Sequence, residues 1–340
     1  MNPLRALATL TTATLLVAGL VSCGGESGEP TASSSGSSAA PLRKIQVSLD
    51  WTPNTNHTGL YVAKAKGFYA RHGLDVEIIQ PGDADPAALV AADKIPFAIG
   101  YQEALTQARS QGAPLISIAA IIQHNTSGFA SPKDRPLSRP ADYAGKTYGS
   151  FGGPIEEPLL KTIVKADGGD PDSIKTVNVG DADFFAATKK GIDLVWIFYA
   201  WTGIQAELRG EPVSIQYVKD YDKALDFYTP ILISNETRIA KDPQLVRDFL
   251  AATSEGYDFA AANAAESADI LLEAAPDLDA ELVKKSQEWL SPRYKDEAPR
   301  WGRQNPRIWA DFSKWLFDQK VLTVEVDPAK AFTNDFLPNG

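Results

Sequence analysis

Four short stretches of the sequence place carboxylates and aromatic side chains at the ends of predicted strands. They are Asp50-Trp51, Tyr101-Gln102-Glu103, Gly152-Gly153 with Glu156-Glu157, and the run from Trp196 to Trp201. A flat heteroaromatic ring gains burial and offset-stacking energy between aromatic side chains. A carboxylate accepts paired, charge-assisted hydrogen bonds from a ring N–H and an exocyclic amine. These residue types therefore predict a site for an aminated heteroaromatic molecule.

The first stretch also has a structural interpretation. Trp51 could be an ordinary core residue, and Asp50 could cap the turn that follows. Asn54 or Asn56 could be the N-cap of the next helix, because asparagine is among the preferred N-cap residues. His57 falls in the first turn of that helix, where we expect a structural rather than a catalytic role. The sequence leaves both interpretations of this stretch open.

The later stretches carry the same ambiguity. Glu156 and Glu157 are well placed for the positive end of a helix dipole, and one of them could do only that. Trp196, Phe198 and Trp201 could fill the core around their strand. The sequence does not decide whether Asp50 or one of the glutamates binds the ligand amine, and we expect Glu157 to do so.

A βαβαβ pattern positions the first two stretches. Strands are predicted at 45–49, 74–80, 97–100 and 115–122, with helices at 61–72 and 103–111. Strands that alternate with helices in this way predict a mainly parallel sheet. In open α/β folds, small molecules bind in the crevice outside the carboxyl ends of the strands. The first two stretches lie at such ends.

A second βα set positions the other two stretches. Its strands are predicted at 146–150, 176–179 and 194–196, with helices at 155–166 and 184–190. A proline-spaced segment, 131–145, is predicted to link the two sets, and a strand at 228–234 to cross back. The predicted plan is two α/β lobes on a two-segment hinge, with residues 42–129 and 232–340 in lobe 1 and residues 130–231 in lobe 2. Such a molecule can close around a ligand.

Composition narrows the possible chemistry. The chain has 340 residues, a formal net charge of −10, one cysteine and three scattered histidines. The acidic balance argues against a nucleic-acid partner, which needs lysine and arginine in excess. One cysteine excludes internal disulfides and a multi-thiolate metal site. We therefore expect no metal and no cofactor, and no nucleophile–base pair indicates an enzyme.

The N-terminus is typical of an exported lipoprotein. Residues 1–23 combine a basic start, an apolar run and a terminal Cys23, as in a bacterial lipoprotein signal peptide. An ordinary secretory signal with an incidental cysteine is the alternative. Lipidation of Cys23 would anchor the protein, extracytoplasmically, to the outer face of the cell membrane. Residues 24–41, rich in Gly and Ser, are predicted to be a flexible tether.

Several sequence motifs together resemble those of one family. DWTPNTNHTGLYVAKAKGFY, IGYQEA, IIQHNTSGFAS, GGPIEEP and WIFYAWTGIQAEL are similar to words in substrate-binding lipoproteins of ABC importers that scavenge thiamine pyrimidine precursors such as formylaminopyrimidine. That group has the pyrimidine-synthase-like type II periplasmic-binding fold. The resemblance implies an ABC permease and ATPase as partners, and a monomer. It implies ligand contacts at Asp50, Trp51, Tyr101, Glu157, Trp196, Tyr199 and Trp201. Asn54, His57 and Gly153, from the same strand-end stretches, complete the predicted set of ligand-binding residues.

Two relatives of this family, which share some of these motifs, have different activities. One is an enzyme that makes hydroxymethylpyrimidine from its own histidine and pyridoxal phosphate, using iron and a cysteine cluster. This chain has no cysteine beyond Cys23, so it departs from that enzyme at the required thiols. The other is an importer component that binds riboflavin, which is also a flat heterocycle. The sequence separates a pyrimidine ligand poorly from riboflavin.

Overall fold

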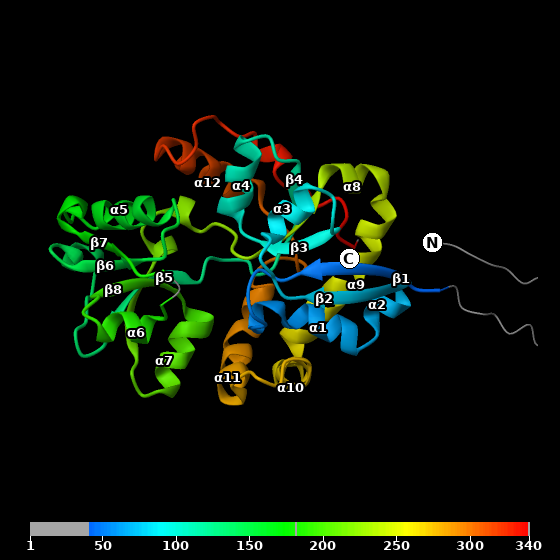
Figure 1. Cartoon of the computed structure of the whole chain (residues 1–340), viewed down its shortest axis with the longest axis horizontal. Helices are drawn as coiled ribbons and strands as arrows, with labels where there is room; N and C mark the ends of the chain where they lie inside the picture. Colours follow the sequence, from blue (N-terminus) through cyan, green and yellow to red (C-terminus); the bar gives the residue numbers. More distant parts are fainter. Residues whose placement is uncertain (1–40, 181, 339–340) are drawn as a thin grey trace, which may run out of the picture. The chain divides into compact units, whose positions relative to one another are not determined.

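The computed structural model describes residues 41–180 and 182–338. The predicted signal peptide with Cys23, and the tether up to residue 40, lie outside these residues and stay predictions. The described residues form two five-stranded sheets with helices on their faces (Figure 1). This arrangement confirms the predicted pair of α/β lobes.

The sheet of lobe 1 has the strand order β2-β1-β3-β10-β4. β1, β2 and β3 are parallel, and β10 is antiparallel to both β3 and β4. β4 therefore runs in the same direction as β3. The bounds are β1 (Arg43–Ser48), β2 (Leu74–Ile79), β3 (Phe97–Gly100), β4 (Leu115–Ala120) and β10 (Ile231–Asn235).

The sheet of lobe 2 repeats this plan with the order β7-β6-β8-β5-β9. β6 is parallel to β7 and β8, and β5 is antiparallel to β8 and β9. The bounds are β5 (Ser127–Pro132), β6 (Thr147–Ser150), β7 (Lys175–Asn178), β8 (Leu194–Phe198) and β9 (Val213–Tyr217). Each sheet thus has one antiparallel strand in its fourth position.

Helices cover both faces of each sheet. In lobe 1, α1 and α9 pack on one face and α3 and α4 on the other; in lobe 2, α5 and α6 lie on opposite faces. The bounds are α1 (Thr58–Ala65), α2 (Phe68–Arg71), α3 (Pro86–Ala91), α4 (Gln102–Ser110), α5 (Glu156–Ala166), α6 (Phe184–Lys189), α7 (Ile204–Leu208), α8 (Glu236–Lys241), α9 (Pro243–Ala262), α10 (Ala264–Ala274), α11 (Ala280–Leu290) and α12 (Pro306–Asp318).

Three of these helices begin with the same local signal. α3, α9 and α12 each start with a proline that follows a capping side chain, Asp85, Asp242 or Asn305. A capping oxygen satisfies an N–H of the first turn, and proline lacks the N–H that would stay unpaired there. The sequence therefore sets where these helices begin.

The chain crosses between the two sheets twice, and the first crossing does not lie where the sequence analysis predicted it. It leaves lobe 1 after β4, and residues 121–126 lead directly into β5; it returns through residues 226–230, just before β10. The predicted crossover at 131–145 is wrong, because Ser131 and Pro132 already pair with β9 inside lobe 2. The prolines there form a turn within lobe 2, which their spacing did not distinguish from a linker.

Strand direction places the predicted site stretches at matching edges. β1, β3 and β4 all end at the edge from which residues 121–126 leave lobe 1. In lobe 2, β8 ends beside the start of β5, where Phe198 pairs with Ser127, and β6 runs parallel to β8. The carboxyl ends of β1, β3, β6 and β8 therefore all lie at the crossing side of their sheets.

The C-terminal region departs from the predicted boundaries. Trp309 of α12 belongs to an apolar cluster of lobe 1, whereas Phe312 and Trp315 belong to the cluster of lobe 2. Nε1 of Trp315 also donates to the hydroxyl of Thr162 in α5, at 3.2 Å. Residues 232–340 thus do not all return to lobe 1, because α12 packs against both lobes.

Among the described residues, no helix combines the length and the apolar character that a membrane span requires.

Candidate ligand-binding site

Asp50 joins side chains from three elements at the end of β1. Its Oδ1 lies 2.6 Å from Nε2 of His57, and its Oδ2 accepts a hydrogen bond from the hydroxyl of Tyr101. His57 ends the 3-10 turn Thr55–His57, and Tyr101 stands between β3 and α4. Because β1 lies beside β3 in the sheet, the strand order brings these residues together. The structure thus gathers three predicted site residues.

The second ring nitrogen of His57 decides where its proton lies. Nδ1 accepts the backbone N–H of Asn54 at 3.2 Å, which leaves Nε2 as the nitrogen that donates its N–H to Asp50. Burial raises the pKa of the Asp50 carboxyl, but the attraction of His57 and hydrogen bonds from His57 and Tyr101 outweigh it, so this pKa lies below its usual value. Asp50 is therefore ionised at neutral pH and keeps lone pairs for a ligand.

The two neighbours of Asp50 in the motif have different surroundings. The Trp51 side chain is 54% exposed, so it is not a core residue. Asn54 is buried, and its Oδ1 accepts the N–H of Asn56 at 2.9 Å as the N-cap of the 3-10 turn. Capping is thus the confirmed role of Asn54, and a ligand contact by it stays a prediction. Trp51 offers a free indole face beside an ionised carboxylate.

The glycine turn between β6 and α5 is organised by Glu156. The carboxylate of Glu156 accepts the N–H groups of Phe151 at 3.0 Å and Gly153 at 2.6 Å, and the hydroxyl of Tyr148. Glu156 is 2% exposed. Gly152 has a φ of +96°, a conformation that glycine adopts without the strain of a side chain. Gly153, a predicted site residue, therefore lies on an exposed turn that Glu156 holds from inside.

Glu157 lies on the outer side of α5. Its carboxylate is 2.9 Å from Nζ of Lys161, and its side chain is 64% exposed. Together with Lys161 it lines a shallow surface cavity that also contacts Pro171 and Thr176. The geometry does not bring Glu157 to Asp50 or to the glycine turn. Its predicted contact with a ligand amine stays a prediction without structural support.

Two of the predicted tryptophans pack against apolar clusters, Trp196 as a buried residue and Trp201 as a partly buried one. Trp196 is 8% exposed and belongs to the same apolar cluster as Phe129 in lobe 2. Trp201 packs against a small cluster that contains Leu271 of α10 and Val283 of α11. The core interpretation therefore describes Trp196, and Trp201 contacts helices of lobe 1. Ligand contacts by these residues stay predictions.

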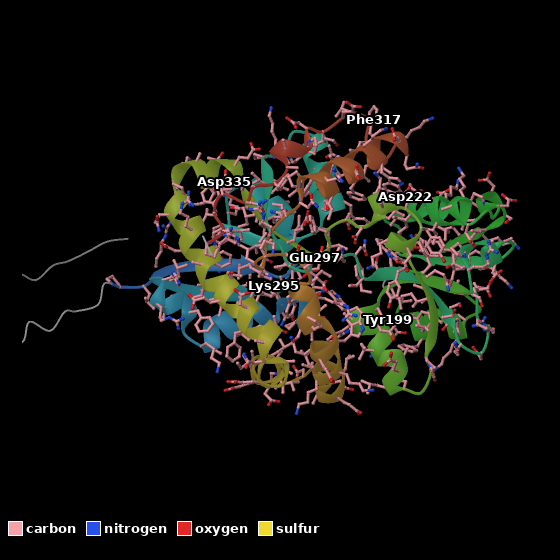
Figure 2. All side chains as sticks on the ribbon, turned by 180° about the vertical axis from the view of Figure 1, so that it is seen from behind. Tyr199, Asp222, Lys295, Glu297, Phe317 and Asp335 are labelled. Atoms are coloured by element: carbon pink, nitrogen blue, oxygen red, sulfur yellow. The ribbon has the colours of Figure 1, made fainter. Side chains whose placement is uncertain are left out.

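Tyr199, which is labelled in Figure 2, belongs to an aromatic group with Trp289 and Tyr217. Its ring centroid is 5.4 Å from that of Trp289 and 6.0 Å from that of Tyr217, and its hydroxyl donates to Glu207. Trp289 and Tyr217 line a cavity of about 470 Å³ together with His124. Tyr199 thus lies next to two residues that line this cavity, and a ligand contact by it stays a prediction.

One aromatic side chain at a strand end was missing from the predicted set. Phe151 follows β6 directly and is 46% exposed. It is the counterpart in lobe 2 of Trp51, since both are exposed aromatics at carboxyl ends on the crossing side. The signal was available, because Phe151 stands between a predicted strand and the glycine pair. Glu103, which belongs to the second predicted stretch, has a pKa that burial raises to about 7.

Within the described residues, no group of three or more His, Cys, Asp or Glu side chains is arranged to hold a metal ion.

Known proteins resemble this chain along most of its length. A family model described as "NMT1/THI5 like" matches residues 54–267. The formylaminopyrimidine-binding protein of Halalkalibacterium halodurans is 30% identical over 86% of this chain and 90% of its own. The riboflavin-binding protein RibY of Chloroflexus aurantiacus is 26% identical over 92% and 91%. A 4-amino-5-hydroxymethyl-2-methylpyrimidine phosphate synthase of Legionella pneumophila is 24% identical over 87% and 93%.

The solved structures agree on the fold. The periplasmic aliphatic sulphonate binding protein SsuA of Escherichia coli superposes with a TM-score of 0.69 at 14% identity, covering 88% of this chain and 94% of that protein. This likeness shows the architecture and not the ligand. The match over residues 54–267 and the 30% identity along most of the chain establish that this protein belongs to the NMT1/THI5-like family, with the two-lobed fold of periplasmic binding proteins.

Proposed function

We propose that this protein is the solute-binding component of an ABC importer and captures a pyrimidine precursor of thiamine outside the cell. It delivers that ligand unchanged to a permease and its ATPase. In this proposal the protein acts as a monomer and is anchored through Cys23 to the outer face of the membrane. The 30% identity to a formylaminopyrimidine-binding protein supports the ligand class.

The observation that carries the proposal is the pair of exposed aromatic side chains at matching strand ends. Trp51 in lobe 1 and Phe151 in lobe 2 are 54% and 46% exposed, although burying a large apolar side chain is worth about 1.5–3 kcal/mol. A ring held between them would cover both and add offset stacking. Closure of the lobes would then be stabilised by contacts that the open form lacks.

Asp50 supplies the polar half of this site. It is ionised, next to Trp51 in the chain, and held in place by His57 and Tyr101. An exocyclic amine or a ring N–H can donate to its remaining lone pairs in a charge-assisted bond. In the refined proposal Asp50, rather than Glu157, binds the amine edge of the ring.

Riboflavin is the second candidate ligand. The chain is 26% identical to RibY over nearly its whole length, and an isoalloxazine ring is also flat enough for the two aromatic side chains. The enzyme alternative has less support. The chain has a single cysteine, in its N-terminal segment, whereas the synthase it resembles uses a cysteine cluster.

A thermal-shift screen with formylaminopyrimidine, hydroxymethylpyrimidine, thiamine and riboflavin tests the ligand. A ligand at ~100 times its dissociation constant should add about 2.7 kcal/mol of stability. We expect the first two compounds to raise the melting temperature. A shift with riboflavin alone would replace the pyrimidine by a flavin, and silence from all four would reject the proposed function.

The site itself is tested with alanine variants of the two exposed aromatics. Trp51→Ala and Phe151→Ala should each weaken binding of the best ligand about tenfold or more, which corresponds to ~1.4 kcal/mol. The matched control is Phe317→Ala, an exposed aromatic on α12 that should leave the affinity unchanged. Wild-type affinity in both site variants would show that the ligand binds elsewhere.

A further inference from the structure

The turn before α5 has the form of an anion-binding site, but its three N–H donors are already in use. A glycine-rich turn that leads into a helix N-terminus commonly binds phosphate or sulfonate through backbone N–H groups. Here the N–H groups of Phe151 and Gly153 both donate to Glu156, and the N–H of Gly152 donates to the hydroxyl of Ser150 at 2.9 Å. All three N–H groups of the turn are bonded within the protein.

Glu156 fits this position closely. Its carboxylate also accepts the hydroxyl of Tyr148, and the whole residue is 2% exposed. A Cβ on Gly153 would lie 3.2 Å from Oε1 of Glu156, closer than nearly all real contacts of that kind. The turn is thus built tightly around one carboxylate, which stands where a bound anion would otherwise stand.

The stretch of lobe 1 that we propose for the ligand is also acidic. Asp50 is ionised, and a cavity of about 140 Å³ beside it is lined by Asp50 and Asp85. Neither lysine nor arginine is found among the described residues that line this cavity. In the proposed site, an anionic ligand would therefore meet the negative charge of Asp50, and at the glycine turn it would find N–H groups already bonded to Glu156 and Ser150. At about 4 Å, two like charges at a protein surface repel by several kcal/mol.

We propose that Glu156 is an anion-excluding residue, which fills the anion site at the start of α5 so that the protein takes neutral or cationic heteroaromatic ligands and rejects their phosphate esters and sulfonates. This inference rests on the proposed function for the location of the ligand. It assigns Glu156 a role in specificity beyond holding the turn.

The direct test uses inorganic sulfate as the probe and does not need the ligand. Glu156→Ala frees two backbone N–H groups and the Tyr148 hydroxyl. Sulfate, compared with chloride at equal ionic strength, should then raise the melting temperature saturably, by about 2–4 °C at ~10 times its dissociation constant. The wild-type protein should show no such sulfate-specific shift. Absence of a saturable shift in Glu156→Ala would overturn the proposal and leave Glu156 a structural brace.

Two controls separate this effect from simple charge removal and from unfolding. Glu157→Ala removes the same charge one residue further along α5, where no turn N–H groups are freed. It should gain no sulfate binding, and a gain equal to that of Glu156→Ala would overturn the proposal. If the orphaned hydroxyl unfolds Glu156→Ala, the double variant Glu156→Ala with Tyr148→Phe removes that unpaired group and is tested in the same way.

A second experiment compares hydroxymethylpyrimidine with its phosphate ester by calorimetry. The wild type should bind the neutral compound at least about 100-fold more tightly than its phosphate ester. In Glu156→Ala, this ratio of the two affinities should be about tenfold smaller. Equal wild-type affinities, or an unchanged ratio in the variant, would overturn the proposal while the proposed function stands. If the wild type binds neither compound nor riboflavin, the proposed function fails, and the sulfate test still decides the role of Glu156.

Discussion

At the scale of single residues, hydrogen bonds decide which carboxylate can meet a ligand. Asp50 has both oxygens bonded, yet it remains partly accessible beside the exposed Trp51. Glu156 is committed to the turn, and Glu157 is paired with Lys161. In our proposal, Asp50 and Trp51 are the two of these four positions that recognise the ligand.

Asp50→Asn should weaken binding of an amine-bearing ligand about tenfold. It should also destabilise the protein by about 1–3 kcal/mol, because an amide has only one oxygen for the two donors, His57 and Tyr101.

The stabilising effect of Asp50 should depend on pH. The folded-state pKa of Asp50 lies below its usual value, so this effect is present above about pH 4 and is lost as the pH falls through the lower folded-state pKa.

Calorimetry at neutral pH and urea unfolding at pH 3 and pH 7 measure these two effects. Asp85→Asn is the control, because Asp85 lines the same cavity but caps α3. A stability difference between wild type and Asp50→Asn that is as large at pH 3 as at pH 7 would contradict the role given to the charge.

At the scale of elements, His124 connects the segments that pass between the lobes. His124 lies in the first crossing, and its Nδ1 is 2.6 Å from Asp226 of the second crossing. Its Nε2 is 3.0 Å from Glu297, which is labelled in Figure 2. Asn125 adds a backbone N–H bond of 2.8 Å to Asp226. Both imidazole nitrogens face carboxylates, so the ring is held as an imidazolium that joins three segments.

The stability of the protein should depend on pH through His124. The hydrogen bond to Asp226, helped by Glu297, raises the pKa of His124 from 6.5 to about 9. A raised folded-state pKa gives stability that is fully present below pH 6.5 and is lost as the pH rises through about 9. Discounted for the 32% exposure of the side chain, we expect a loss of about 1 kcal/mol across this window.

Urea unfolding at pH 6 and pH 9.5 checks this expectation. His124→Gln should remove most of the difference between the two pH values. His72→Gln is the control, since His72 contacts one carboxylate, Glu255, away from the crossings. If the wild type and His124→Gln lose the same stability over this range, the imidazolium does not join the crossings as described.

At the scale of the whole molecule, α12 is a connection between the lobes in addition to the two crossings. Its first half packs in lobe 1 through Trp309, and its second half packs in lobe 2 through Phe312 and Trp315. Any change in the relation of the two lobes must therefore be accommodated by α12 or by the residues next to it. A description of the hinge must therefore include α12 as well as the two crossing segments.

Trp315→Ala should destabilise the protein by about 3–5 kcal/mol, because it removes a nearly buried indole and leaves a cavity against α5. Phe317→Ala, on the exposed side of the same helix, should cost less than about 1 kcal/mol. Urea unfolding of both variants measures the difference. Similar small losses in both would show that α12 is not anchored in lobe 2.

The sequence by itself determined the local elements and the chemistry at their ends. Alternation predicted β1 and a short apolar run predicted β3, and the strand ends at Asp50 and Tyr101 followed from them. A predicted helix at 61–72 is in fact two helices, because Gly67 adopts a φ of +70° between them. These features depend on spacing within a few residues, which a single chain displays.

Only the tertiary structure decided which of the candidate side chains are available. It placed Trp51 and Phe151 in solvent and Trp196 in the core, and it gave the turn to Glu156 rather than to its neighbour Glu157. It also moved the first crossing to residues 121–126 and set α12 against both lobes. The packing of Trp196 and of α12 depends on contacts between residues far apart in the sequence, such as Trp315 with Thr162, and local spacing carries no information about them. The turn held by Glu156 is local, but the sequence alone does not decide which of two adjacent glutamates points into it.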